Sequence, residues 1–262
     1  MPHFRMRFVN SALLLLLFLI DGSGQVFAGA ITAWGYNYYG QVTNAPTGSD
    51  FTTLAAYSDG GIALRSNGSI AVWGDNSFGQ VSNAPSSGVY KAIAGGGGHL
   101  LALRADGSII GWGNSQFGAL TGTPSGTGFS AIAAGDYTNY ALAADGSIVA
   151  WGFDAYNAVS NTPTGTGFKQ IAANAYGGIA LRVDGSIATW GEDTYSTISN
   201  TPSGTGFISI GAGRRTGYAI KADGSIVAWG WNFNSEVSSA PTGTFQAGHW
   251  KRRERFRSEF WR

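Results

Sequence analysis

Side chains that could support catalysis are few in this sequence, and they lie far apart. The 262 residues include 3 histidines, His3, His99 and His249, and no cysteine. A zinc site needs a close set of histidine, cysteine or carboxylate ligands, so no metal site is predicted. The serines lie in Gly-Ser turns without a base partner, and the glycine run at 96–98 lacks the Lys-Ser/Thr of a phosphate loop. We therefore expect no enzyme activity and no cofactor.

Carboxylates provide one weaker catalytic candidate, the adjacent Glu192 and Asp193. A glycosidase needs two carboxylates that face each other across a cleft, and nothing in the sequence places these two that way. Other acidic residues stand in Asp-Gly pairs, for which turn chemistry is the simpler explanation.

The elements that position all these residues come from a tandem repeat. The pair Trp-Gly recurs every 39 residues, at Trp34, Trp73, Trp112, Trp151, Trp190 and Trp229. A fixed period of this length indicates one supersecondary unit copied in tandem, which buries its apolar face only against its neighbours. The units begin at residues 31, 70, 109, 148, 187 and 226.

Each unit is predicted to be made of short strands. In the fourth unit the apolar runs are 148–151, 168–173 and 179–183, and Asp184-Gly185 then leads into the next run. Asn-Gly or Asp-Gly stands between two such runs in each of the five full units, which predicts a type I′ hairpin turn. No segment has a helical apolar period. Glycine is abundant at 41 residues and only 12% of residues are charged, against about 25% in an average domain.

The sequence therefore predicts an all-β fold, a β-propeller of five full blades with a partial sixth. A β-solenoid is the alternative. We expect the Trp column to pack between neighbouring units and the proline column to mark loops or strand edges. A second aromatic column is also predicted to be core; it comprises Tyr39, Phe78, Phe117, Tyr156 and Tyr195.

These columns resemble the regulator of chromosome condensation repeat over residues 31–244. The resemblance rests on residues 73–76 (Trp-Gly-Asp-Asn), Gly79-Gln80, Pro85, His99 and Asp106-Gly107. It implies a propeller, and the short even period is similar to that of bacterial secreted members, including the β-lactamase inhibitory propellers. The histidine of the family pattern occurs once, at His99, and the seven blades usual in the family would need more units than this chain has.

Residues that vary between units are the candidates for partner binding, because exposed Tyr, Trp and Arg are common at interface hot spots. One set lies two places after the Trp: Tyr36, Asp75, Phe153, Glu192 and Trp231, with Asn114 in the remaining unit. The other set follows the Ile-Ala-Ala run: Asp136, Tyr137, Tyr176, Arg214 and Arg215.

The N-terminus is typical of a secretory signal peptide. Arg5 and Arg7 precede the apolar run 12–20, and small residues around Ala28 and Ala30 offer cleavage after residue 28 or 30. The run is shorter than the ~20 residues of a membrane span. We expect a signal peptide at 1–30 and a secreted, periplasmic or cell-surface protein.

Charge divides the rest of the chain into two parts. Residues 31–245 carry 8 Lys/Arg and 12 Asp/Glu, whereas residues 246–262 carry 6 basic and 2 acidic residues. The propeller body has no basic stripe, which argues against nucleic-acid binding. The segment 246–262 lacks the repeat pattern, and is either an aberrant, out-of-frame end or a basic-aromatic tail for an acidic surface or anionic lipid.

The leading hypothesis is a secreted, non-enzymatic scaffold whose variable loops bind an extracellular or periplasmic protein. The alternative is a cell-surface carbohydrate-binding propeller, in which Tyr36, Phe153 and Trp231 stack on sugar rings.

Overall fold

The computed structural model describes residues 12–16, 19–20, 26–27, 29–233, 235–241 and 243. The predicted cleavage position at Ala28 and the predicted tail at 246–262 lie outside these residues. The described chain consists of strands and loops, with two three-residue 3-10 turns, η1 (Gln116–Gly118) and η2 (Ala155–Asn157). The all-β prediction is confirmed.

The strands form five antiparallel blades of three strands each within the described chain. In chain order the blades are β5 (Phe51–Tyr57), β6 (Gly60–Arg65) and β7 (Ile70–Gly74); β8 (Tyr90–Gly95), β9 (His99–Arg104) and β10 (Ile109–Gly113); β11 (Phe129–Ala134), β12 (Thr138–Ala143) and β13 (Ile148–Gly152); β14 (Phe168–Asn174), β15 (Gly177–Arg182) and β16 (Ile187–Gly191); and β17 (Phe207–Ala212), β18 (Thr216–Lys221) and β19 (Ile226–Gly230).

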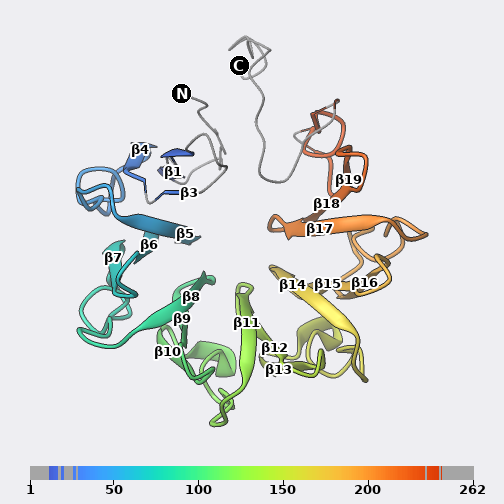
Figure 1. Cartoon of the computed structure of the whole chain (residues 1–262), viewed down its shortest axis with the longest axis horizontal. Coiled ribbons are helices and arrows are strands. Elements are labelled where there is room, and N and C mark those ends of the chain that lie inside the picture. The colour runs from blue at the N-terminus through green and yellow to red at the C-terminus, as the bar shows by residue number, and fades with distance from the viewer. Residues whose placement is uncertain are drawn as a thin grey trace.

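The blades are arranged around a common centre, and the first strand of each blade lies nearest to it (Figure 1). Successive first strands contact each other, and the second strand of each blade contacts the first strand of the next. This radial order is that of a propeller, as predicted.

The blades are out of phase with the sequence units by one strand. Each blade takes its first two strands from one unit and its third strand, which carries the Trp-Gly pair, from the next unit. The half unit at the C-terminal end therefore completes the fifth blade with β19. The Trp strand of the first unit, β4 (Ile31–Gly35), lies outside the five blades (Figure 1).

Strand β4 pairs with β1 (Ala12–Leu16), from the apolar run assigned to the signal peptide. Ala12 is paired with Gly35 as His99 is paired with Gly113, so β1 takes the register of the second strand of a blade. Strands β2 (Leu19–Ile20) and β3 (Val26–Phe27) form a separate pair. Among the described residues there is no helix with the length and apolar character needed to cross a membrane.

The Trp column packs between blades, as predicted. Trp112 is 7% exposed and lies in one cluster with Ile62 and Leu64 of the preceding blade. Trp190 and Trp229 are packed in the same way against Tyr140 and Leu181 of their preceding blades. Each of these indoles fills the space between two sheets, which is why the unit cannot fold alone.

The Asn-Gly and Asp-Gly turns connect the second and third strands, but the type I′ prediction is wrong. Gly68 has a positive φ of 81°, whereas Asn67 is absent from the residues with positive φ. Gly68 N donates to Arg65 O, and Arg65 N donates to Ser69 O. This is a three-residue loop, a type I turn followed by a glycine bulge.

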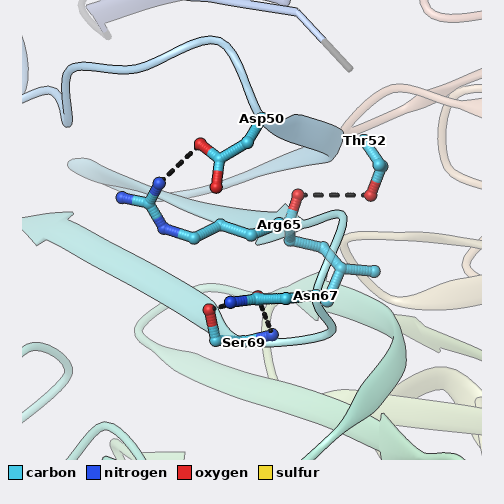
Figure 2. A network of polar contacts seen from close by, with 6 residues as sticks. Asp50, Thr52, Arg65, Asn67 and Ser69 are labelled. Carbon is cyan, nitrogen blue, oxygen red and sulfur yellow. Dashed lines mark hydrogen bonds and ion pairs between the residues drawn. The ribbon is translucent and has the colours of Figure 1, made fainter. Parts of the chain in front are cut away.

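The side chain of the residue before the turn glycine holds the serine that follows the glycine. Asn67 Oδ1 accepts hydrogen bonds from Ser69 N at 2.9 Å and Ser69 Oγ at 2.7 Å, and the Arg65–Asp50 ion pair lies beside this turn (Figure 2). Asp106 holds Ser108 by the same two bonds, which lower the pKa of its carboxyl. These acidic side chains therefore stabilise turns.

Candidate functional site

The two predicted sets of variable residues lie together on one face of the propeller. In every blade the turn between the first two strands is hydrogen-bonded to the residue that follows the third strand. Phe153 N donates to Tyr137 O at 3.0 Å and Trp231 N donates to Arg215 O at 3.0 Å; Asp75, Asn114 and Glu192 make the equivalent bond to Asp59, Gly98 and Tyr176. The Asn-Gly and Asp-Gly turns occupy the other ends of these strands, on the opposite face.

Near the centre of this face, the turns of successive blades are hydrogen-bonded to one another. Gly97 N donates to Asp136 O, Asp136 N donates to Ala175 O, and Ala175 N donates to Arg214 O at 2.8 Å. Arg214 also forms a 3.1 Å ion pair with Asp136, two blades away. The Asp136 carboxylate raises the pKa of Arg214. The central turns of successive blades are thus connected to one another on this face.

The second aromatic column was expected in the core, and this prediction is wrong. Tyr39, Phe78, Phe117 and Tyr156 are 40–58% exposed, and Tyr195 is half-buried. These residues lie in the loops that follow the third strand, and the loops lean toward the next blade: η1 contacts β13 and η2 contacts β16. Each ring covers the seam between two blades with one side and faces solvent with the other. Repetition in register reflects this common loop path, not burial.

Each seam between two blades therefore carries a cluster of three residues, here called a seam cluster. A seam cluster contains one aromatic residue from the loop of one blade and the two variable residues of the next. In order the clusters are Phe78, Gly98 and Asn114; Phe117, Tyr137 and Phe153; Tyr156, Tyr176 and Glu192; and Tyr195, Arg215 and Trp231.

The seam clusters differ in chemistry. In the second, the Phe117 ring lies 4.9 Å from that of Tyr137 and 5.0 Å from that of Phe153, so this seam is wholly aromatic. In the third, the rings of Tyr156 and Tyr176 lie 5.6 Å apart. In the first, Gly98 leaves Phe78 without a large side chain opposite it.

The fourth seam cluster contains a cation. The Arg215 guanidinium carbon lies 4.4 Å from the ring centre of Tyr195 and 5.2 Å from that of Trp231. The two rings are 5.3 Å apart, and Phe233 stacks on Trp231 at 6.1 Å. Cation–π contacts of this kind contribute about 0.5–2 kcal/mol each.

Acidic residues lie at the first blade, far along the row of blades from the fourth seam cluster. Burial, and then the charge of Asp75, raise the pKa of Asp59, while a hydrogen bond from Gln41 opposes them. Asp75 is held by its own loop, because Ser77 N and Gln80 Nε2 both donate to its carboxylate at 3.0 Å. Tyr36, the remaining predicted residue, is 48% exposed and stacks on Tyr38.

The Glu192-Asp193 pair is explained by the loop. Asp193 Oδ1 accepts hydrogen bonds from Ile198 N and Ser199 N, and these bonds lower the pKa of its carboxyl. Asn76, Asp154 and Asn232 anchor their loops by the same pair of bonds. Glu192 is only 7% exposed. Within the described residues no group of three metal-ligating side chains is close enough to hold an ion.

Sequence reasoning found the variable residues of this face but missed their aromatic partners. The signal that identifies them is position: each aromatic of the column stands directly before a residue with positive φ, as at Gly79 and Gly118. Such a backbone belongs to a surface turn, where a recurring aromatic is exposed.

Comparisons with known proteins agree with the repeat and the fold. The model of the Regulator of chromosome condensation (RCC1) repeat matches residues 51–80 and 90–119, which contain the strands of the first and second blades. The predicted resemblance is confirmed for these two adjacent repeats. No curated protein matches the sequence.

Several solved structures share the propeller fold. The CRINKLY WD40 ectodomain of the Arabidopsis thaliana receptor kinase ACR4 has a TM-score of 0.68 and 22% identity, over 90% of this chain and 84% of that one. Prp20p from Saccharomyces cerevisiae has a TM-score of 0.67 and 19% identity, over 89% and 73% of the two chains. The Physcomitrella patens receptor kinase CR4 ectodomain has a TM-score of 0.65 and 20% identity; the match covers 84% of this chain and 59% of that ectodomain. The propeller prediction is confirmed.

Proposed function

We propose that this chain is an exported bacterial protein, a non-catalytic scaffold that binds another protein through its seam clusters. The observation that carries this proposal is the aromatic face itself: Phe117, Tyr156 and Phe153 are each at least 37% exposed, and all lie on one side of the propeller. Large aromatic residues and arginine are the side chains most often found at interface hot spots.

The opposite face supports the choice of side. It carries short Asn-Gly and Asp-Gly turns with exposed polar side chains, and it offers no aromatic cluster among the described residues. Protein binding is also known for this fold in yeast, where binding of Prp20p to Gsp1p and histones and its complex with Kap60 have been described. The mildly acidic body of the present chain favours a protein over a nucleic acid.

Export is proposed from the N-terminal sequence. Cleavage after residue 28 or 30 leaves the propeller body 31–245 together with the following segment. Cleavage also removes β1, so that one edge of β4 becomes free in the mature protein.

Site-specific crosslinking tests the binding face. A photoreactive phenylalanine analogue placed at Phe117 should capture a protein partner in the culture of the native organism. The control position is Val183, a 67% exposed apolar residue in a turn on the opposite face. Equal capture from both positions would contradict the proposal, and so would hydrolysis of a substrate by the purified protein.

Carbohydrate binding is the second candidate. It has weaker support because sugar recognition needs a free ring face, whereas Trp231 is flanked by Tyr195, Phe233 and the Arg215 guanidinium. Phe153 is likewise engaged by Phe117. A glycan array separates the candidates: sugar binding that Trp231→Ala abolishes would favour the lectin.

A further inference from the structure

Two adjacent arginines, Arg214 and Arg215, lie on the face that carries the seam clusters, and they differ in what they contact. The Arg214 side chain is 67% exposed and is already paired with Asp136. Among the described residues the ion pairs are made by Arg65 and Arg214, and Arg215 makes none. The Arg215 guanidinium instead contacts the rings of Tyr195 and Trp231. Arg215 is thus a cation held in place without a counter-charge.

The hydrogen-bonding state of Arg215 is also incomplete. Its Nε atom is buried and has no hydrogen-bond partner among the residues that the structure describes. A buried donor left without an acceptor is unfavourable by about 1–3 kcal/mol. A docked ligand does not reach this buried atom; what it supplies is a counter-charge for a guanidinium that no carboxylate of the described residues neutralises.

Geometry limits the anion. Tyr195 and Trp231 flank the guanidinium, and their rings are only 5.3 Å apart. A carboxylate is planar and can accept two parallel hydrogen bonds from the guanidinium edge. Next to the cation stands Phe233, 81% exposed and stacked on Trp231, which offers an apolar surface.

We infer that Arg215 is the anchor for an Asp or Glu side chain of the protein partner, and that Phe233 receives an apolar residue beside it. This inference rests on the proposed function and specifies its partner: an exposed loop or terminus in which an acidic residue is next to an aromatic or aliphatic one. Arg214 is not part of the anchor because Asp136 already neutralises it.

Peptide selection tests the inference with the full chain. Random peptides displayed on phage are selected on the protein, and the best binder is synthesised with its acidic residue and with the amide equivalent, Asn or Gln. We expect the selected peptides to share an acidic residue beside an apolar one, and the amide peptide to bind about tenfold more weakly, equivalent to about 1.4 kcal/mol.

The four combinations of two peptides and two proteins identify the contact. With Arg215→Gln the acidic and amide peptides should bind equally, whereas Arg214→Gln should preserve the tenfold difference. If Arg215 only stiffened the loop, its loss would weaken both peptides by the same factor. If Arg215→Gln fails to fold, Arg215→Lys is used, and the tenfold preference should fall without vanishing, because lysine keeps the charge but cannot make two parallel bonds to a carboxylate.

Several results would overturn the inference. These are selected peptides without an acidic residue, a tenfold preference that survives Arg215→Gln, or inorganic phosphate competing more strongly than acetate. The proposed function would survive them if crosslinking at Phe117 still captured a protein. Failure of that crosslink together with failure of peptide selection would instead remove both proposals.

Discussion

His99 is buried at the seam between the second and third blades, where a chain of hydrogen bonds determines which ring nitrogen carries the hydrogen. Asn139 Nδ2 donates to Ala119 O at 2.6 Å, so Asn139 Oδ1 faces His99 Nε2 at 2.7 Å and accepts a hydrogen bond from its N–H. His99 Nδ1 is buried and finds no partner in the described part of the chain. The Ala119 carbonyl occupies the position that receives the indole N–H in other blades, and Trp151 Nε1 accordingly has no partner.

This environment predicts a pH-dependent stability. Burial lowers the pKa of His99 in the folded protein, against smaller opposite effects of Asn139 and Asp136. The unfolded chain, with a pKa near ~6.5, therefore binds the proton first as the pH falls. The free energy of unfolding should be constant above about pH 7 and should decrease below it, by at most about 1.4 kcal/mol per pH unit.

Urea denaturation between about pH 7.5 and 5 measures this effect. His99→Gln should lose the slope over this range, because glutamine does not titrate. Aspartates with lowered pKa, such as Asp106 and Asp145, titrate at lower pH and are common to both proteins. An identical slope in wild type and variant would contradict the prediction.

At the scale of the element, one loop position controls the path of every aromatic loop. It has positive φ in all units, and it is glycine at Gly40, Gly79 and Gly118, with φ of 77° in each. In the later units Asn157, Ser196 and Ser235 adopt φ of 55–63°. An L-residue in this region costs about 1–2 kcal/mol, which glycine avoids.

A reciprocal pair of substitutions tests this position. Gly118→Ser should destabilise the protein by about 1 kcal/mol through the backbone alone, because the nearest atom to a new Cβ is 4.0 Å away. Ser196→Gly should stabilise it by a few tenths of a kcal/mol, since greater unfolded-state entropy offsets part of the gain. Thermal unfolding monitored by circular dichroism measures both changes. Effects of the same sign would show that φ does not decide this position.

Strands and turns followed from the sequence because their causes are local. The apolar run at 148–151 became β13, and glycine marked each hairpin. Two features did not follow. The phase of the blades depends on which strand pairs with which, and the same 39-residue period permits either choice. The exposure of Phe117 and Tyr156 depends on loops that cross a seam, and recurrence in register does not distinguish a seam from a core.

At the scale of the whole molecule, the side of the fifth blade that faces away from the fourth blade is apolar, and it is here called the flank. In the fourth blade, Ile179 and Leu181 are 2% and 0% exposed because they pack against the fifth blade. Their equivalents in the fifth blade, Tyr218 and Ile220, are only half-buried. Strand β4 lies at the other end of the row of blades, so the two ends offer different surfaces (Figure 1).

Unlike surfaces at two ends favour head-to-tail contacts between copies. We therefore expect the protein to self-associate through this flank, in a manner that increases with concentration. Ile220→Lys should shift the protein toward monomer and change its unfolding free energy little, because the side chain is already half in solvent.

Leu181→Lys is the matched control: the same change at a buried seam places a charge between two blades and should prevent folding. Light scattering coupled to size-exclusion chromatography over a range of concentrations measures the association. A wild-type protein that stays monomeric throughout would mean that the flank is covered within a single chain.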